Sequence, residues 1–206
     1  EFLDTGSLDL IRNRFPSMLP SDSSAMLMIE IDGSQSEIQC SINDILAACK
    51  TAGLICANQV DNPTALWQAR KTLSPLLREI APKKINEDIV VPVTTLPEFF
   101  TNLTYLCAQY HLANVNFGHA GNGNIHVNLL IDPDDTSQAI QAEQCLDEIF
   151  NLVIKLRGTL SGEHGIGCEK RAFITKEIDD NTLNLMKAIK NLFDPNDILN
   201  PGKIFP

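Results

Sequence analysis

The residues best suited to chemistry lie in two glycine-rich segments, which together hold three of the four histidines. The first, residues 117–128, reads Phe-Gly-His-Ala-Gly-Asn-Gly-Asn-Ile-His-Val-Asn and contains His119 and His126. The second, residues 161–167, reads Ser-Gly-Glu-His-Gly-Ile-Gly and places a carboxylate next to an imidazole. Because glycine lets a backbone approach a ligand closely, segments of this composition suit a binding site.

Two imidazoles and one carboxylate would form an open metal site. His119, His126 and Glu163 supply the donor set that suits zinc, manganese or ferrous iron, with positions left for water or substrate. His164 is then free to act as a base near neutral pH. The residues alone leave three reaction classes open: metal-assisted hydrolysis, ferrous oxygenation, and oxidation of a chelating hydroxy acid. The alternative is that these are hydrogen-bonded core histidines and ordinary glycine turns.

A hairpin must bring the two histidines together. Its strands are expected at 113–119 and 124–131, joined by an Ala-Gly-Asn-Gly turn. Alternation along the second strand places three polar side chains on one face: Asn124, His126 and Asn128. Strict alternation from Phe117 would put His119 on the apolar side, so the turn is expected to swing the His119 side chain round.

Arg70 lies inside the apolar stripe of a helix expected at 63–80. A guanidinium in such a position needs an anionic partner, because burying it unpaired is costly. That partner is either another side chain, in an internal salt bridge, or the carboxylate of a substrate, which arginine binds in bidentate fashion. A further alternative is a snorkelling stem, which keeps the guanidinium in water. Ser74 lies one turn later on the same face and would add a hydrogen bond.

The remaining pattern mixes helices and strands and predicts an α+β fold, a ferredoxin-like layer with a largely antiparallel sheet covered by helices. Further strands are expected at 25–32 (buried), 54–60 and 88–93. Further helices are expected at 36–52, 97–110, 136–157, 168–176 and 180–193, with an irregular tail over 194–206.

Charge and composition exclude several classes of protein. A formal net charge of −10 argues against nucleic-acid binding, which needs basic surface. The six cysteines show no CxxC pair or regular spacing, which favours a reducing compartment. Neither a signal peptide nor an apolar run of membrane-spanning length is found in these residues, and from the start at Glu1 we expect a fragment or a processed product.

Five strings in the sequence resemble the C-terminal domain of the FAD-linked oxidases, the group that includes the glycolate oxidase FAD subunit, cytochrome-type D-lactate dehydrogenase and D-2-hydroxyglutarate dehydrogenase. They are Leu-Trp-Gln-Ala-Arg (66–70), Asn-Glu-Asp-Ile-Val-Val-Pro (86–92), Gly-His-Ala-Gly-Asn-Gly-Asn-Ile-His-Val-Asn (118–128), Gly-Glu-His-Gly-Ile-Gly (162–167), and Phe-Asp-Pro (193–195) with Leu-Asn-Pro-Gly-Lys (199–203). They occur in the family's order and cover essentially the whole chain.

The resemblance implies that residues 1–206 are the cap domain of a longer enzyme whose N-terminal FAD-binding domain is absent here. The whole enzyme would oxidise a D-2-hydroxy acid to a 2-oxo acid by hydride transfer to FAD, and pass electrons to a quinone, cytochrome or similar acceptor. The fragment alone would be inactive. A homodimer is compatible with the resemblance, and the expected location is cytoplasmic, peripheral to the inner membrane, or mitochondrial. The alternatives are a stand-alone metal-binding or metallohydrolase domain and a non-catalytic subunit of an oxidase complex.

Site roles carry over from the family by position. His119, His126 and Glu163 match ligands of a divalent metal, for which zinc or manganese is expected, and His164 matches the base that takes the hydroxyl proton. Arg70, Ser74 and Asn128 match substrate-binding positions.

Two departures from the family pattern bear on the substrate and the metal. Asn122 stands where the family's hairpin usually has aspartate, which removes one negative charge beside the metal. Asn86 stands where hydroxyglutarate-type members have lysine, and Lys84 lies two residues earlier. The second departure favours D-lactate or glycolate over a dicarboxylate.

Overall fold

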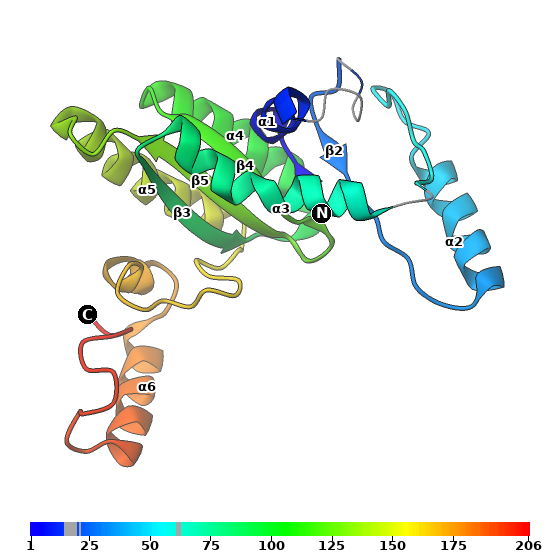
Figure 1. The fold of residues 1–206 in the computed structure, drawn as a ribbon. Helices are drawn as coiled ribbons and strands as arrows, with labels where there is room; N and C mark the ends of the chain where they lie inside the picture. The colour runs from blue at the N-terminus through cyan, green and yellow to red at the C-terminus, as the bar shows by residue number, and fades with distance from the viewer. Residues whose placement is uncertain (15–19, 21, 61–62) are drawn as a thin grey trace. The chain divides into compact units, whose positions relative to one another are not determined.

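The computed structural model describes the chain except for residues 15–19, 21 and 61–62 (Figure 1). It divides into two compact units, residues 1–80 and residues 81–206. The elements of the first unit are β1 (Phe2–Leu3), α1 (Thr5–Arg14), β2 (Met26–Leu27), α2 (Gln35–Ala48) and α3 (Pro63–Ile80). Those of the second are β3 (Lys83–Val90), η1 (Val93–Thr95), α4 (Leu96–Gln109), β4 (Ala113–His119), η2 (Ala120–Asn122), β5 (Asn124–Ile131), α5 (Thr136–Lys155), η3 (Arg171–Lys176) and α6 (Asp180–Phe193).

The first unit is built on the contact between α1 and α3. The apolar residues of α3 recur at helical spacing, so that one stripe is buried: Ala69, Leu73, Leu76 and Leu77. This confirms the helix predicted over 63–80, and α2 confirms most of the helix predicted over 36–52. The α2 helix begins with a capping box, in which Ser34 and Glu37 satisfy backbone groups of its first turn.

The strand predicted at 25–32 is confirmed only in part, and the strand predicted at 54–60 is wrong. Of residues 25–32, β2 pairs with β1, with Phe2 opposite Leu27, and Met28 exchanges backbone hydrogen bonds with Glu1. Met28 is buried as predicted, but Leu27 and Ile29 are 59% and 54% exposed. Residues 54–60 form no strand and are exposed. An apolar run forms a strand only where a neighbouring edge offers backbone partners, and within the described part of this unit the edge opposite residues 26–28 is only residues 1–3.

The sheet of the second unit is antiparallel, with the order β4-β5-β3. Because β3 and β4 both run antiparallel to β5, they are parallel to each other, and α4 is the crossover of a split β-α-β unit. Thr159, after α5, exchanges two backbone hydrogen bonds with Val90 on the outer edge of β3. That is the place of the fourth strand in a ferredoxin-like layer, so the predicted α+β class is confirmed.

The helices α4 and α5 pack against each other and against the sheet, α4 on β4 and α5 on β5 (Figure 1). They bury a core that includes Phe99, Leu103, Ile149 and Phe150. The sheet contributes Ile89 of β3 and, from one face of β5, Ile125, Val127 and Leu129. The opposite face of β5 is left to Asn124, His126 and Asn128, as alternation predicts.

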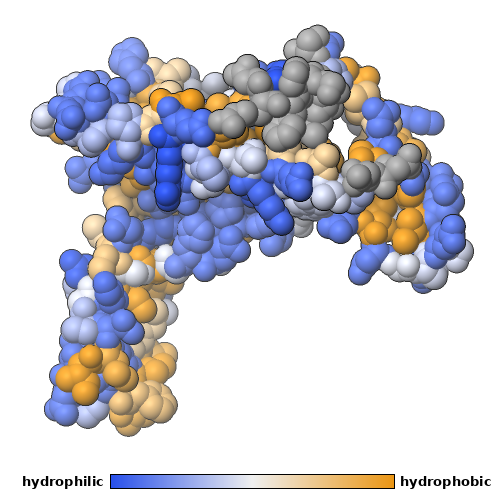
Figure 2. Space-filling model, viewed as in Figure 1, coloured by the Kyte–Doolittle hydropathy of each residue, from blue (hydrophilic) through white to orange (hydrophobic). Residues whose placement is uncertain are grey.

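Some boundaries in the second unit differ from those predicted. The strand expected at 88–93 begins earlier, at Lys83, and ends at Val90. The helix expected at 168–176 is the 3₁₀ helix η3. The helix α6 is confirmed, and it exposes an apolar row, visible over the C-terminal segment in Figure 2, formed by Leu185, Ile189, Leu192 and Phe193. All six cysteines lie in the described residues and are free thiols. Among the described helices, none has the length and apolar character needed to cross a bilayer.

Candidate metal centre

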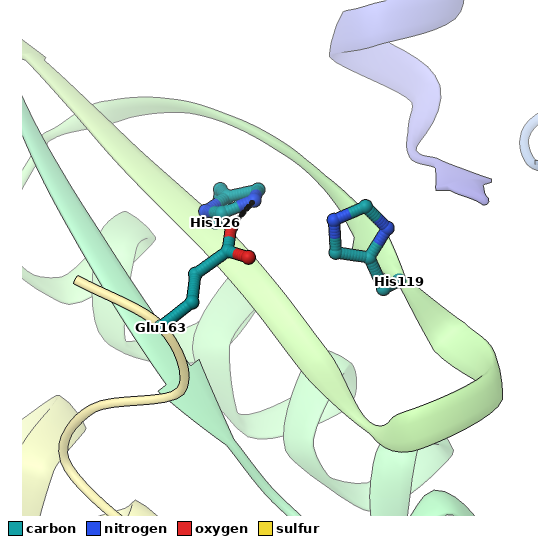
Figure 3. A group of neighbouring side chains, drawn as sticks. All are labelled: His119, His126 and Glu163. Atoms are coloured by element: carbon teal, nitrogen blue, oxygen red, sulfur yellow. Dashed lines mark ion pairs between the residues drawn. The ribbon is translucent and has the colours of Figure 1, made fainter.

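Three potential ligands converge at one end of the β4–β5 hairpin. His119 ends β4, His126 lies in β5, and Glu163 belongs to the loop after Leu160 (Figure 3). One ligand atom from each of the three lies within 4.8 Å of the others. His126 Nε2 and Glu163 Oε1 are 3.5 Å apart. The structure therefore brings together the three residues that the sequence pattern singles out.

The hairpin register explains why His119 faces His126, and it corrects the expectation that the turn swings the side chain round. Phe117 lies directly opposite His126, and His119 directly opposite Asn124. Since cross-strand partners share a face, Phe117 and His119 both lie on the polar face of the sheet. Plain alternation then suffices for His119. The error was to assign Phe117 to the apolar face by its type, whereas its ring lies 5.9 Å from that of His126.

The donor set and its spacing fit a divalent cation. Two imidazole nitrogens and a carboxylate oxygen are typical ligands of zinc and manganese. Tetrahedral bonds of about 2.0–2.1 Å place donor atoms about 3.4 Å apart, close to the 3.5 Å that separates His126 and Glu163. Glu163 is exposed, so its side chain is free to adjust to the remaining ligand. Three protein ligands leave coordination positions for water or substrate.

His164, the predicted base, lies beside this cluster. Its ring stacks on that of His126, with centroids 5.4 Å apart and planes 21° apart. The residue is exposed, so the imidazole can exchange protons with a bound molecule or with solvent. An exposed imidazole next to an open coordination site is suited to general base catalysis.

Asp88 organises the loop and was not identified from the sequence. One of its oxygens, Oδ2, accepts hydrogen bonds from three successive backbone N–H groups, those of Gly162 (2.9 Å), Glu163 (2.7 Å) and His164 (2.8 Å). The other, Oδ1, accepts from the amide of Asn124. Burial would raise the pKa of Asp88, but the hydrogen bonds from His164, Asn124 and Glu163 outweigh it and hold the pKa far below its usual range.

A sequence signal for Asp88 did exist. The carboxylate occupies a buried, β-branched strand, where an unpaired charge is costly. Alternation along β3, together with the register opposite His126, places Asp88 on the polar face. Only the pairing of β3 with β5 reveals this.

Asn128 is buried on the polar face of the sheet, and its side-chain amide forms hydrogen bonds within the sheet. Its Nδ2 donates to the carbonyl of Val115 (2.9 Å), and its Oδ1 accepts from Asn86 Nδ2 (2.7 Å). These bonds fix the orientation of the Asn128 side chain. Its predicted contact with substrate stays a prediction.

Arg70 and Ser74 belong to the first unit, on α3. Arg70 Nε lies 3.1 Å from Glu1 Oε2, and the two side chains are only 15% and 7% exposed. The structure thus provides the internal salt bridge that was one of the alternatives for Arg70. A substrate carboxylate would compete with Glu1 for the same guanidinium, and the substrate-binding roles of Arg70 and Ser74 stay predictions.

Comparison with known proteins places the chain in a family. The family described as "FAD linked oxidases, C-terminal domain" matches residues 1–204. The chain belongs to the FAD-linked oxidases. Its relatives include the glycolate oxidase subunit GlcD of Bacillus subtilis, 34% identical over all of this chain and 44% of that protein. A D-lactate dehydrogenase of Anaerostipes hadrus is 31% identical over 87% of this chain and 39% of its own length.

A third relative, the D-2-hydroxyglutarate dehydrogenase of Stutzerimonas stutzeri, is 35% identical over 68% of this chain and 31% of its own length. The chain thus spans less than half the length of these FAD-linked relatives. A solved structure, that of 4-ethylphenol oxidase from Gulosibacter chungangensis, matches 89% of this chain and 39% of its own with a TM-score of 0.59. At 17% identity this likeness concerns the fold alone.

Proposed function

We propose that this chain is the substrate- and metal-binding C-terminal domain of an FAD-dependent D-2-hydroxy-acid dehydrogenase of the D-lactate or glycolate type. The observation that carries the proposal is the convergence of His119, His126 and Glu163, whose ligand atoms lie within 4.8 Å of one another, in a chain of the FAD-linked oxidase family. The relatives named for D-lactate and for glycolate oxidation support the substrate class.

In this proposal the three converging residues hold a divalent cation, zinc or manganese. Such a cation, when bound, lowers the pKa of a coordinated hydroxyl group. His164, stacked on His126, accepts the hydroxyl proton. Arg70 and Ser74 bind the substrate carboxylate and fix its orientation. Asn128 supplies a polar contact on the same face as His126.

A domain outside this sequence is proposed to hold the flavin, which would supply the acceptor for the hydride of the substrate's α-carbon. The glycines of 118–123 lie in a hairpin, whereas a dinucleotide fingerprint sits at a strand-to-helix turn. The part of the reaction assigned to the present residues is therefore binding, orientation and proton transfer.

A monocarboxylic substrate is proposed because of Asn86. Its side chain donates to Asn128 across β3 and β5 (2.7 Å) and carries no charge. A second substrate carboxylate would find an amide at this position, which binds a carboxylate less strongly than a charged group does. D-lactate and glycolate lack that second carboxylate.

The test uses the full-length protein that contains this chain and a panel of D-2-hydroxy acids with a dye as electron acceptor. We expect oxidation of D-lactate or glycolate, loss of activity on chelation, and recovery when zinc or manganese is added back. His126→Ala should abolish both metal binding and activity. His111→Asn is the matched control, because His111 is exposed and has a φ of 54°, which asparagine tolerates.

The outcomes separate the proposal from its rivals. Dehydrogenase activity that survives complete removal of metal would refute the metal-assisted mechanism. Metal binding with no oxidation of any hydroxy acid would point to a stand-alone metal-binding domain or a non-catalytic subunit. Equal losses in His126→Ala and His111→Asn would show that the effect is not specific to the site.

A further inference from the structure

We propose that Asp88 is a positioning residue that sets where Glu163 and His164 lie relative to His119 and His126. The inference rests on the proposed metal site and adds to it the group that positions the loop carrying Glu163 and His164. Asp88 contacts neither metal nor substrate in this proposal. It acts through the backbone of the loop that carries one ligand and the base.

The first step of the argument is the hydrogen-bond pattern. Three consecutive N–H groups, from residues 162–164, converge on a single oxygen, Asp88 Oδ2, at 2.7–2.9 Å. The Ser161 hydroxyl donates to the same oxygen at 3.3 Å. Ser161 Oγ in turn accepts from the N–H of Gly165 at 2.7 Å. Hydrogen bonds to an ionised carboxylate are shorter and stronger than those between neutral groups.

The second step is that Asp88 is itself held in place. It is buried on β3, directly opposite His126 on β5, and the amide of Asn124 donates to its other oxygen. The carboxylate therefore lies in a fixed position relative to His126. A loop hydrogen-bonded to that carboxylate is therefore held in place relative to β5, which carries His126 and pairs with β4, the strand that carries His119.

The third step is a second tie from β3 to the start of the same loop. Lys170, only 3% exposed, donates to the Asp88 carbonyl (2.7 Å) and to the Leu160 carbonyl (2.6 Å). Its ammonium also lies 3.5 Å from the buried carboxylate of Glu87. Lys170 thus holds the loop to β3 at Leu160. Two residues later, the N–H of Gly162 donates to the Asp88 carboxylate.

The fourth step is the close approach that this geometry demands. A Cβ placed on Gly162 would lie 2.8 Å from Asp88 Oδ1, a distance that real Cβ atoms do not show. The loop backbone therefore contacts Asp88 and Asn124 without room for a side chain. With the loop this close to β3 and β5, Glu163 forms its ion pair with His126 and the His164 ring stacks on that of His126.

The test is Asp88→Asn in the full-length protein, with Asp135→Asn as control. The control alters another aspartate that accepts backbone N–H groups, those of Ser137 and Gln138 at the start of α5. We expect Asp88→Asn to weaken zinc affinity about 10–100-fold, as loss of a group that orients a ligand does. It should lower kcat far more than it raises KM. Asp135→Asn should change neither zinc affinity nor kcat.

A double-mutant cycle separates positioning from a general loss of structure. If Asp88 acts on the metal through Glu163, then Asp88→Asn should reduce zinc affinity much less in a Glu163→Gln background than in the wild type. Full additivity of the two losses, or an unchanged zinc affinity in Asp88→Asn, would overturn the proposal.

Hydrogen–deuterium exchange keeps the inference testable in every case. Amides 162–164 should be protected in the wild-type protein and exchange faster in Asp88→Asn, whereas amides of β5 should be unaffected. If Asp88→Asn does not fold, the wild-type protein decides, and unprotected amides at 162–164 would refute the clamp. If the wild type binds no zinc, the proposed function fails, and the exchange data still judge the role of Asp88.

Discussion

Replacing Gly162 with alanine should disable the metal centre by steric displacement of one loop. The added Cβ would lie 2.8 Å from Asp88 Oδ1, about 0.6 Å inside an ordinary contact of 3.4 Å, and closer still to the Asn124 amide. Both neighbours are buried and hydrogen-bonded to each other. The loop must therefore move outward rather than the strands. The φ of Gly162 is not positive, so steric contact alone is at issue.

The expected size of the effect follows from that displacement. The bonds from residues 162–164 to Asp88 Oδ2 measure 2.7–2.9 Å. Relief of the contact with Asp88 Oδ1 needs an outward shift of about 0.6 Å, and the nearer Asn124 amide demands more, so these bonds lengthen to or past the limit of a hydrogen bond. Overpacking of this kind costs about 1–3 kcal/mol of stability. Misplacing a ligand through its supporting contacts weakens metal affinity about 10–100-fold, and misplacing a base by up to 1 Å lowers turnover up to about 100-fold.

The assay is competitive titration of zinc with a chromogenic chelator, together with kcat for the full-length protein. Gly121→Ala is the matched control, since Gly121 lies in the other glycine-rich segment, has no positive φ, and its Cβ would meet nothing within 4 Å. We expect Gly121→Ala to behave as wild type. If Gly162→Ala binds zinc as tightly as Gly121→Ala does, the loop does not depend on close contact with Asp88, and the reasoning is refuted.

Three further predictions concern stability and substrate binding. Lys170→Met should lower the free energy of unfolding, measured by denaturant titration, by about 3–5 kcal/mol, because it leaves Glu87 buried without its cation. The same measurement on the double variant Lys170→Met, Glu87→Leu should show that much of the loss is recovered. Arg70→Lys should raise KM for the hydroxy acid with zinc affinity unchanged, because lysine cannot bind a carboxylate in bidentate fashion, and an unchanged KM would remove Arg70 from the substrate site. Gly123→Ala should lower the melting temperature measured by circular dichroism, since the φ of Gly123 is +78° and its Cβ would overlap the Val91 carbonyl; an unchanged melting temperature would contradict the turn geometry.

The parts of the fold that could be predicted from the sequence are those set by local pattern. The apolar stripe of α3 and the alternation of β5 follow from spacing alone, and both elements have the predicted bounds. The turn between β4 and β5 was predictable because it needs a residue with positive φ, and the sequence has a glycine, Gly123, at that position. Since His119 and His126 lie on either side of that turn, their proximity was predictable with it.

Most of the strand expected at 25–32, and all of the strand expected at 54–60, is absent, because strand formation depends on a partner as well as on composition. An exposed apolar segment such as Ile29 or Leu54–Val60 has the right residue types for a strand. A strand also needs a hydrogen-bonding edge of another segment, and that requirement is not encoded in the segment itself. Helices satisfy their own backbone groups, which explains why α2 was predictable from the same unit.

Asp88 was missed for a related reason. Its partners are backbone N–H groups 74 to 76 residues away, and backbone groups carry no sequence signature. The visible signal was indirect: a charged residue in a buried strand, and glycine at position 162 of the loop. Each has an ordinary explanation by itself. The two signals point to a common role only when the register places Asp88 opposite His126.

The candidate centre therefore combines ligands from a hydrogen-bonded hairpin with residues from an exposed loop. His119 and His126 are fixed to each other by the β4–β5 register, in which every pair from Ala113–Leu130 to His119–Asn124 is maintained. Glu163 and His164 belong to an exposed loop, whose place relative to that hairpin is set by the buried carboxylate of Asp88. Substitutions in the hairpin should consequently affect folding and metal binding together. Substitutions in the loop should separate the two, because the loop forms none of the sheet's pairings and can be displaced while the sheet stays intact.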